Sequence, residues 1–406
     1  MSRRGGTGAL PAFDAAGVAV PLPRHSSRIT LSQRALSTNL RFLRGKIGER
    51  AILSSVVKAN AFGHGIDSFV PMAERAGVRH FSVASSQEAR QVLGARREDG
   101  RIMIMGILYP EDLDWVIGNG IDFFVFDIER LQAALRVARR IGTPARVHLE
   151  VETGGNRTGL TEEPFEASLA LLREHPEHLS FEGLATHFAG IESLANQFRI
   201  VAQQRAFERF DARARQVGPV PRLRHAACSA AALAFPDTVY DLVRIGTAQY
   251  GFWPSPDVYH LHLLQIGRER DNPLKRVMTW KTDVMDLKDV AKGDFVGYGT
   301  AFQAPRDMVV GVLPVGYSDG YPRALSNRGH VLVRGREAHV VGLVNMNVTM
   351  VDVTDVPNVD VGDEVVLVGR QGRRAISVAS FSEVASALNN EFVSRLPAAI
   401  PRTPVR

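Results

Sequence analysis

From residue 28 to about residue 268, the chain alternates short apolar runs with longer amphipathic stretches. The apolar runs are rich in Val, Ile, Leu and Phe and lack strict alternation, which is typical of parallel strands buried on both faces. Eight strand–helix repeats over roughly 220 residues match a (β/α)8 TIM-type barrel in number and size. The strand-like runs are Ile52–Val57, His80–Ala84, Arg101–Leu108, Phe123–Asp127, Arg146–Thr153, Phe181–Phe188, Leu223–Ala227 and Leu242–Gly246, and the helical stretches between them include Glu129–Ile141, Glu163–Glu174 and Asn196–Val217.

The pattern changes after about residue 270, where short and often alternating runs are separated by Gly or Pro turns. This pattern predicts a mainly antiparallel β domain. A chain of 406 residues is too long for one ordinary core. We therefore expect a flexible tail at 1–27, a barrel at 28–268 and a β domain at 269–406, with one helix near Val378–Leu388. The expected β segments are Val277–Leu287, Asp294–Phe302, Met308–Pro314, His330–Val333, His339–Leu343, Met346–Val353 and Glu364–Val368.

Charge and cysteine content argue against several classes of function. The formal net charge is +6, but the arginines are scattered and are not interleaved with aromatic residues. This favours a solvated surface over a nucleic-acid-binding one. Cys228 is the single cysteine, so no disulfide can form within the chain, which fits a reducing compartment. Because no apolar run approaches a membrane span and residues 1–27 do not read as a secretory signal, we expect a cytoplasmic protein.

A lysine follows the first strand-like run directly, in the sequence Val56-Val57-Lys58. In a barrel of this kind the functional site lies at the carboxyl ends of the strands. A lysine placed there can have its pKa lowered and can form a Schiff base with a carbonyl compound. The alternative, a lysine that extends to solvent at the end of a strand, is equally consistent with its position alone.

Polar residues at the other strand ends favour the functional interpretation. A hydroxyl and the backbone N–H groups of a Gly-containing turn are suited to holding a phosphate group. Taken alone, His187 would more often be a core histidine whose hydrogen bonds are satisfied, but the residues converge on one rim as a set. They are Glu150, Glu152, Thr153, Asn156, Arg157, Thr186, His187, His225, Ser229, Arg244, Gly246 and Thr247.

The segment from Lys58 to Gly65, Lys-Ala-Asn-Ala-Phe-Gly-His-Gly, resembles the pyridoxal-lysine signature of the alanine racemases. The resemblance runs from about Arg28 to Arg402, nearly the whole chain. The lysine segment alone supports the family resemblance only moderately, because related decarboxylases carry a shorter version of it. The full set of motifs in this order supports it strongly. Its other segments are Glu152–Gly159, Thr186–Phe188, Ser229–Ala231, Arg244–Gly246, Gly297–Gly299, Val315–Gly320 and Ile400–Arg402.

The resemblance implies a racemase that holds pyridoxal 5′-phosphate on Lys58 and uses two bases. Lys58 would act on one face of the substrate α-carbon and Tyr298 on the other, since racemisation needs proton loss on one face and return on the opposite face. Tyr298 would come from the partner subunit, so the family likeness implies a homodimer with shared active sites. We expect no metal, no nucleic acid and no membrane partner.

The resemblance also assigns the remaining site residues. Arg244 would face the pyridine nitrogen of the cofactor, with His187 supporting it from behind. An arginine can donate a hydrogen bond but cannot give the ring a proton, which keeps the ring a weaker electron sink and suits simple proton exchange. The cofactor phosphate would be held by Ser229, Gly246 and Thr247, and the substrate would be contacted by Arg157, Met346 and Tyr317.

The chain departs from the family pattern at four places. Phe62 stands where a phosphate-binding tyrosine is usual, and Thr403-Pro404 occupies the stretch where a second tyrosine is expected. Two lost hydroxyls would weaken cofactor binding by roughly 1–3 kcal/mol if nothing replaces them. Glu150 falls where many members have a lysine that becomes carbamylated, and as a permanent anion it could hold Arg157. Asn347 replaces a common aspartate near the substrate entrance.

Three alternatives to an alanine racemase stay open on the sequence. The first is a racemase for another amino acid, such as serine or a basic one, because the departures affect the substrate more than the reaction type. The second is a decarboxylase of the same barrel, which Arg244 disfavours because those enzymes place a carboxylate at this position. The third is a non-catalytic cofactor carrier, but such proteins are usually a barrel alone, without a β domain. If the leading interpretation is right, the product belongs to D-alanine biosynthesis.

Overall fold

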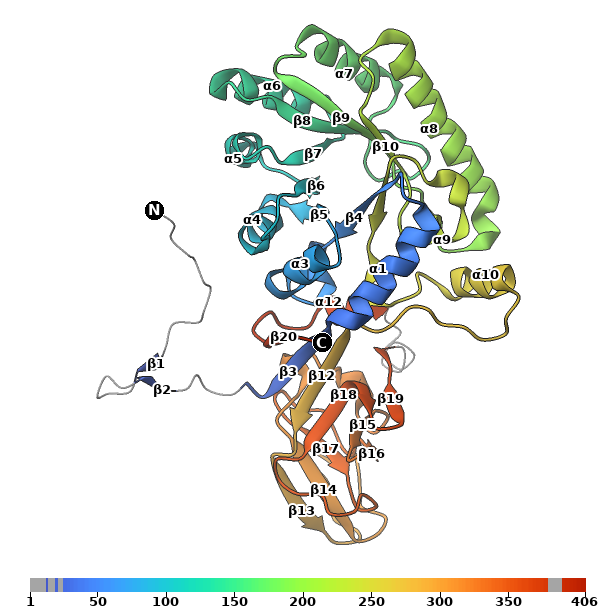
Figure 1. The fold of residues 1–406 in the computed structure, drawn as a ribbon. Coiled ribbons are helices and arrows are strands. Elements are labelled where there is room, and N and C mark those ends of the chain that lie inside the picture. The colour runs from blue at the N-terminus through green and yellow to red at the C-terminus, as the bar shows by residue number, and fades with distance from the viewer. Residues whose placement is uncertain (1–11, 14–18, 21–24, 379–388) are drawn as a thin grey trace.

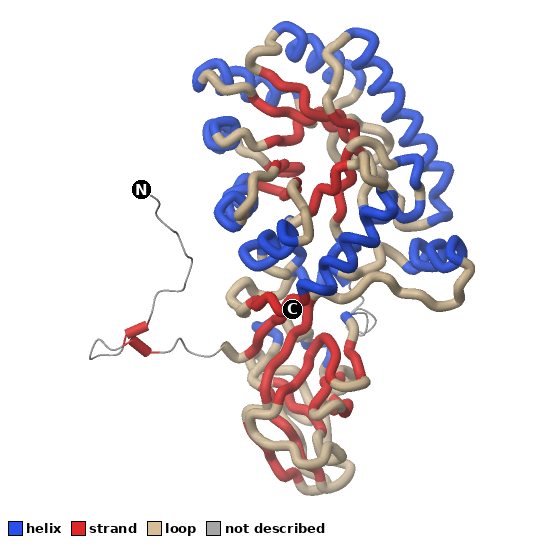
Figure 2. Tube along the Cα trace, viewed as in Figure 1, coloured by secondary structure: helices blue, strands red, loops and turns tan. Residues whose placement is uncertain are grey.

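The computed structural model describes the backbone of residues 12–13, 19–20, 25–378 and 389–406. Most of the predicted tail and residues 379–388 of the predicted helix lie outside the described residues. The described chain forms a ring of strands surrounded by helices and, below it in Figure 1, a smaller unit made almost wholly of strands. Figure 2 shows this contrast in secondary structure between the two units.

The first unit is an eight-stranded parallel barrel, as predicted. Neighbouring strands run in the order β10-β9-β8-β7-β6-β5-β4-β11. Backbone bonds from Asp241 N to Arg224 O and from Arg244 N to Ala227 O, both 3.0 Å, join the two ends of this sheet. The strands are β4 (Ile52–Val56), β5 (His80–Ser85), β6 (Arg101–Ile107), β7 (Asp122–Val125), β8 (Ala145–Glu150), β9 (Leu179–Ala185), β10 (Leu223–His225) and β11 (Leu242–Ile245).

Amphipathic helices surround the barrel because each turns its apolar residues toward the strands. In α6, for example, Leu131, Ala134, Leu135 and Ala138 are buried, the Asp127 side chain caps the first turn, and Gly142 ends the helix in a left-handed conformation. The helices are α1 (Gln33–Ile47), α2 (Lys58–Phe62), α3 (Ile66–Arg75), α4 (Ser86–Ala95), α5 (Leu113–Gly118), α6 (Ile128–Ile141), α7 (Glu162–Glu174), α8 (Gln197–Val217), α9 (Ser229–Ala234) and α10 (Pro256–Ile266).

Ion pairs fill the barrel end at which the strands begin. Arg101 Nη2 lies 2.7 Å from Asp122 Oδ2 and 2.9 Å from Glu182 Oε2, and Arg146 Nε lies 2.8 Å from Asp122 Oδ1. Both carboxylates are buried, and a buried charge is tolerated when it is paired in this way. These ion pairs at the barrel floor are therefore structural.

The second unit is mainly antiparallel, as predicted. One of its sheets has the order β16-β15-β18-β12-β3-β20, with β19 beside β18, and another has the order β13-β14-β17. Its sheet includes β3 from before the barrel, so the chain starts in this unit, passes through the barrel and returns. Its strands are β3 (Ser27–Ser32), β12 (Met278–Asp283), β13 (Asp286–Val290), β14 (Met308–Leu313), β15 (His330–Val333), β16 (Arg336–His339), β17 (Thr349–Asp352), β18 (Glu364–Gln371), β19 (Arg374–Ile376) and β20 (Arg402–Val405), and a short helix, α12 (Asn389–Ser394), precedes β20.

The limits predicted at residues 28 and 268 stay a prediction, and two expected strands are wrong. The segment His339–Leu343 begins at the last residue of β16 and beyond it forms only the isolated bridge from Val340 to Val351. Residues 294–302 form a turn closed by the isolated bridge between Phe295 and Gln303. Two glycines with positive φ, Gly297 at 74° and Gly299 at 67°, allow the chain to reverse there. Tyr298 lies between them, at the tip of this turn.

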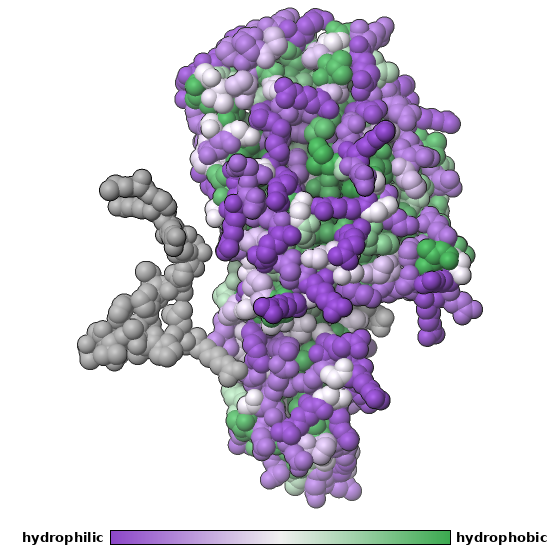
Figure 3. Space-filling model, viewed as in Figure 1, coloured by the Kyte–Doolittle hydropathy of each residue, from purple (hydrophilic) through white to green (hydrophobic). Residues whose placement is uncertain are grey.

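The visible face is mainly hydrophilic, with apolar side chains scattered over both units (Figure 3). Within the described ranges, every helix is too short or too polar to reach across a lipid bilayer. Two short strands, β1 (Ala12–Phe13) and β2 (Ala19–Val20), precede β3 in the sequence and pair with each other in antiparallel fashion.

Candidate active site

Lys58 lies at the mouth of the barrel, just after strand β4, and begins a turn with an unusual backbone conformation. The four residues after it, 59–62, all have φ between 50° and 54°. A left-handed conformation costs an L-residue about 1–2 kcal/mol, so this segment stores backbone strain. Bonds from Gly63 N to Ala59 O (2.9 Å) and from Gly65 N to Asn60 O (2.8 Å) hold the turn. Backbone strain of this kind is concentrated at functional sites.

The surroundings of Lys58 favour its neutral form. Burial of the amine lowers the pKa of Lys58 first, and the positive charges of Arg157 and then Arg244 lower it further, while the carboxylate of Glu88 raises it. A lower pKa leaves a larger fraction of the amine unprotonated near neutral pH. Such an amine can attack a carbonyl carbon.

Arg244 is fixed in place by four hydrogen bonds. It is 4% exposed. Its Nη1 donates to His225 Nδ1 (2.6 Å) and His225 O (3.0 Å), and its Nη2 donates to Thr186 O (2.6 Å) and Ala226 O (3.2 Å). Burial lowers the pKa of Arg244 to about 10, so it stays a cation at neutral pH. The fifth N–H, at Nε, has no hydrogen-bond partner among the described residues.

A chain of buried rings continues from Arg244 toward the barrel floor. Because His225 Nδ1 accepts from Arg244, its Nε2 carries the proton and donates to His148 Nδ1, 2.8 Å away. His148 Nε2 lies 3.7 Å from Asp122 Oδ2. Gly183 makes room for both rings, since a Cβ there would lie 2.1 Å from His148 Nδ1. The expected support of Arg244 by His187 is therefore wrong: His225 supplies it.

The residues predicted to hold a phosphate lie together at the ends of β10 and β11. Ser229 Oγ accepts from Gly246 N (3.0 Å) and Ala248 N (3.4 Å). Thr247 Oγ1 accepts from Asn390 Nδ2 (3.1 Å), so the C-terminal α12 reaches this place. The backbone N–H of Thr247 has no partner among the described residues and is a donor for an anion.

Phe62, which replaces the usual tyrosine, packs beside this loop. Its ring centroid lies 4.9 Å from that of Tyr250, and a Cβ on Gly246 would lie 3.3 Å from its Cζ. The hydroxyl of Tyr250 donates to Val56 O (2.8 Å), so it is already engaged. Phe62 therefore supplies packing, not a hydrogen bond.

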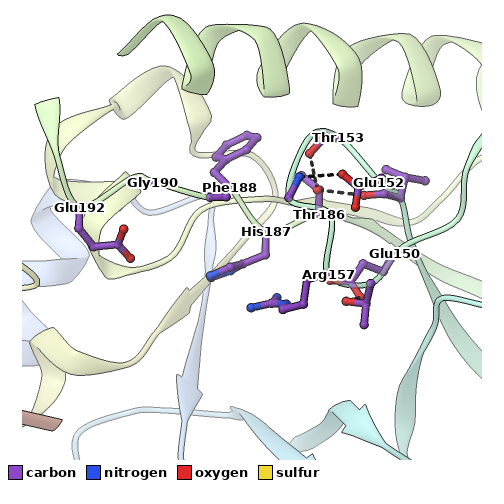
Figure 4. A pocket seen from close by; sticks show the side chains of 13 residues that line it. Glu150, Glu152, Thr153, Arg157, Thr186, His187, Phe188, Gly190 and Glu192 are labelled. Atoms are coloured by element: carbon purple, nitrogen blue, oxygen red, sulfur yellow. Dashed lines mark hydrogen bonds between the residues drawn. The ribbon is translucent and has the colours of Figure 1, made fainter. Parts of the chain in front are cut away.

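A cavity of about 230 Å³ opens beside Arg157 and His187 (Figure 4). The guanidinium of Arg157 points toward His187 and away from Glu150 in this view, and it has no hydrogen-bond partner among the described residues. Glu150 Oε2 instead accepts from Thr158 Oγ1 (2.8 Å). The cavity is lined by Glu150, Val151, Glu152, Thr153, Gly155, Arg157, Thr158, Thr186, His187, Phe188, Ala189, Gly190 and Glu192.

The three predicted site residues of the second unit are all exposed. Tyr298 is 72% exposed, Met346 57% and Tyr317 41%. Backbone bonds from Tyr317 N to Asn345 O (3.0 Å) and from Ser318 N to Met346 O (2.9 Å) bring Tyr317 and Met346 together. No hydrogen bond or ring contact among the described residues joins any of the three to Lys58.

Comparison with protein families accounts for both units. The family described as alanine racemase, N-terminal domain, matches residues 31–254, and the one described as alanine racemase, C-terminal domain, matches residues 277–404. The chain belongs to the alanine racemase family. The family likeness therefore spans the barrel with Lys58 and Arg244 as well as the β unit with Tyr298.

Proteins named as amino-acid racemases match this chain along nearly their whole length. An alanine racemase of Sorangium cellulosum is 36% identical over 394 residues, which cover 93% of this chain and 98% of that one. The crystal structure of an alanine racemase from Streptomyces lavendulae has a TM-score of 0.85 at 30% identity, covering 95% of this chain and 98% of that one. A histidine racemase of Leuconostoc mesenteroides subsp. sake has a TM-score of 0.84 at 27% identity, covering 95% and 99%.

These likenesses confirm the resemblance seen in the motifs and the predicted fold. The chain is an isomerase, a racemase of this family. The decarboxylase and the carrier are not favoured. Within the described residues, no cluster of three or more His, Cys, Asp and Glu side chains could hold a metal ion.

Sequence reasoning missed three contacts in the alanine racemase site. The bond of His225 to Arg244 depends on side-chain packing inside the barrel. Asn390 comes from a segment far along the chain from Thr247. Glu88, whose side chain accepts from Ala59 N (2.6 Å), follows a strand end that was not singled out, although Ser85 and Glu88 have the spacing of a helix cap.

Proposed function

We propose that this chain interconverts L- and D-alanine, with pyridoxal 5′-phosphate held on Lys58 and with Lys58 and Tyr298 as the two bases. The observation that carries the proposal is the arrangement of the barrel mouth, where Lys58 directly follows β4 and the buried Arg244, on the neighbouring β11, is held by four hydrogen bonds. Family membership supports the reaction class. The cytoplasmic location and the role in D-alanine supply stay predictions of the family likeness.

The residues at the mouth fit pyridoxal 5′-phosphate at both of its ends. At one end, Arg244 Nε is a donor without a described partner and suits a neutral ring nitrogen. At the other end, the Thr247 N–H, also without a described partner, lies beside Ser229 and suits the phosphate. When bound, the cofactor supplies an aldehyde that condenses with amines and a conjugated ring that withdraws electrons from the substrate α-carbon.

Lys58 and Tyr298 divide the proton transfers. Lys58 Nζ takes or returns the α-proton on one face of the substrate, and Tyr298 Oη does so on the opposite face. Removal by one base and return by the other inverts the α-carbon, whereas a single base would return the proton to the face it left. The lowered pKa of Lys58 helps it to act as a base near neutral pH.

Arg244 limits how strongly electrons are withdrawn from the substrate. As a cation that keeps its own protons, it would donate a hydrogen bond to the ring nitrogen of the bound cofactor without protonating it. The four bonds to His225, Thr186 and Ala226 hold the guanidinium in one orientation. This arrangement supports proton exchange in preference to deeper bond cleavage.

Arg157 supports an amino acid as substrate, because its positive charge lies beside the cavity at the barrel mouth. The unpaired guanidinium of Arg157 suits the substrate carboxylate. Met346 and Tyr317 would complete the substrate site from the β unit of a partner subunit, together with Tyr298.

Deuterium exchange tests the reaction and the substrate together. The holoenzyme is incubated in deuterated water with L-alanine, L-serine, L-lysine and L-histidine. L-Alanine should gain α-deuterium and yield D-alanine fastest. Faster inversion of another member of the panel would reject alanine as the preferred substrate, and no exchange with any of them would reject the racemase.

A chemical trap tests the assigned lysine. Borohydride reduction of the holoenzyme followed by peptide mass analysis should find one pyridoxyl group on Lys58. Lys58→Ala should lose both this label and the visible absorbance of the bound cofactor. A pyridoxyl group on another lysine would overturn the assignment.

A further inference from the structure

Glu88 makes two hydrogen bonds that connect two strand ends at the barrel mouth. It lies in the first turn of α4, where Ser85 Oγ accepts from its backbone N–H (3.3 Å). Its Oε2 accepts from Ala84 N (2.8 Å), just before α4. Its Oε1 accepts from Ala59 N (2.6 Å), just after β4. One carboxylate therefore ties the start of α4 to the peptide that follows Lys58.

The usual role of such a residue explains only half of this arrangement. A glutamate three residues after a serine cap commonly accepts a backbone N–H at the start of its own helix. The bond to Ala84 is close to that role. The bond to Ala59 is different because it crosses from the end of β5 to the end of the neighbouring β4. It does not cap either end of α4. Its partner is the residue next to Lys58.

The peptide that Glu88 holds begins the left-handed turn. Residues 59–62 all have positive φ, a conformation that non-glycine residues rarely adopt. Such a segment persists only when its surroundings fix it. The bond to Ala59 N fixes its first peptide, and the bond from Ile66 N to Asn60 Oδ1 (3.0 Å) fixes the next residue.

We propose that Glu88 is a positioning residue that holds the Lys58–Ala59 peptide and so sets the direction in which the Lys58 side chain leaves the strand. The inference rests on the proposed function in that Lys58 is the residue that acts. It adds a residue that touches neither substrate nor cofactor and that acts through the backbone of Lys58.

The charge of Glu88 gives this role a second consequence. The other charged or titratable groups that face Lys58 are Arg157, Arg244 and His187, and burial keeps His187 neutral by lowering its pKa to about 3. Glu88 is the carboxylate that opposes the two arginines. Replacing it with a neutral side chain should lower the pKa of Lys58 further.

The test compares Glu88→Gln and Glu88→Asp with Glu74→Gln. Glu74 is a matched control because it is buried on the neighbouring α3 and accepts from the backbone N–H groups of Arg97 (2.9 Å) and Glu98 (3.2 Å). In the full chain freed of cofactor with hydroxylamine, acetylation of Lys58 by acetic anhydride is followed across pH by peptide mass analysis. The labelling midpoint reports the pKa of the Lys58 amine without relying on activity.

We expect Glu88→Gln to move the midpoint down by about half to one pH unit, because one nearby negative charge is removed. Glu88→Asp keeps the charge but shortens the reach, so the midpoint should stay while the holoenzyme loses about tenfold in kcat with little change in KM. Glu74→Gln should change neither quantity.

Two results would overturn the inference. One is a Glu88→Gln chain whose midpoint and kcat equal the native values, whatever its melting temperature. The other is an equal effect of Glu74→Gln, which would mean a general loss of stability. Because the labelling midpoint is measured without substrate, it remains a valid test of Glu88 even if the deuterium experiment rejects alanine racemisation.

Discussion

At the scale of single residues, burial keeps several histidines neutral, from the site at the barrel mouth to the barrel floor. It lowers the pKa of His64 to about 4 and the pKa values of His80 and His187 to about 3. For His187, the charges of Arg244 and Arg157 add to the effect. A neutral ring can accept a hydrogen bond, as His225 does from Arg244. Protonation of these rings would bring uncompensated charge into the barrel.

This predicts an acid sensitivity to which His64 contributes. Its folded pKa of about 4 lies below the unfolded value of 6.5, so between these values the unfolded chain binds more protons and stability falls as the pH falls. Between pH 7 and pH 5 the expected loss from this one residue is about 2 kcal/mol of the free energy of unfolding. The loss is complete below about pH 4.

His64→Phe should remove this part of the dependence, because phenylalanine can pack against Tyr250 and Phe69 as His64 does. Urea unfolding of both chains at pH 7 and pH 5, at equal protein concentrations, measures the change in the free energy of unfolding between the two pH values. The variant will start less stable at pH 7 because the bonds of His64 Nδ1 to Ala61 O and Phe62 O are lost. A drop between the two pH values as large as that of the native chain would contradict the prediction.

At the scale of elements, the last helix and strand close the site around the lysine turn. A Cβ on Gly63 would lie 1.7 Å from Val393 O, so only glycine lets α12 pack this closely on α2. Arg402, at the start of β20, donates from Nε to Gly63 O (3.0 Å). Asn390 of α12 reaches Thr247 at the phosphate end. The amide of Asn390 therefore lies beside the proposed phosphate site, where it orients the hydroxyl of Thr247.

Asn390→Ala should therefore weaken cofactor binding. By donating to Thr247 Oγ1, Asn390 leaves the threonine hydroxyl hydrogen free to point at the phosphate. Loss of one such contact should raise the Kd for pyridoxal 5′-phosphate by up to about tenfold. Titration of the cofactor-free chain, followed by absorbance, measures it. Ser394→Ala is the control because, among the described residues, Ser394 Oγ bonds only within α12, to Glu391 O (3.1 Å). An equal Kd for both variants would reject the role of Asn390.

The sequence predicted elements better than it predicted contacts. The apolar runs located all eight barrel strands because buried parallel strands need continuous apolar residues. The expected strand at Asp294–Phe302 is a turn because Gly297 and Gly299 reverse the chain. The sequence suggests His187 as the support of Arg244, whereas the structure shows His225. The strand pattern does not reveal that Gly183 leaves room for the His225 ring. Asn390 could not be foreseen, because its partner is set by how the C-terminal segment folds back.

At the scale of the whole molecule, the proposed site residues are divided between the barrel and the β unit. Lys58, Arg244 and Arg157 lie at the barrel mouth. Tyr298, with 72% of its surface exposed, lies at the tip of a turn in the β unit. A phenol that serves as a base needs a partner surface to exclude water around it. We infer that a second copy provides that surface, with each barrel mouth facing the β unit of the other subunit.

Mixing two inactive variants tests this arrangement. In a dimer of one Lys58→Ala chain and one Tyr298→Phe chain, one shared site has lost both bases and the other keeps both. Random exchange of equal amounts makes half of the dimers hybrids, each with one intact site of two, so about a quarter of the native racemisation rate should return. The mixture is co-refolded and assayed against each variant refolded alone. If each site took both bases from a single chain, every site would lack one base and no activity above that of the separate variants would return, which would reject the shared site while leaving the role of Lys58 intact.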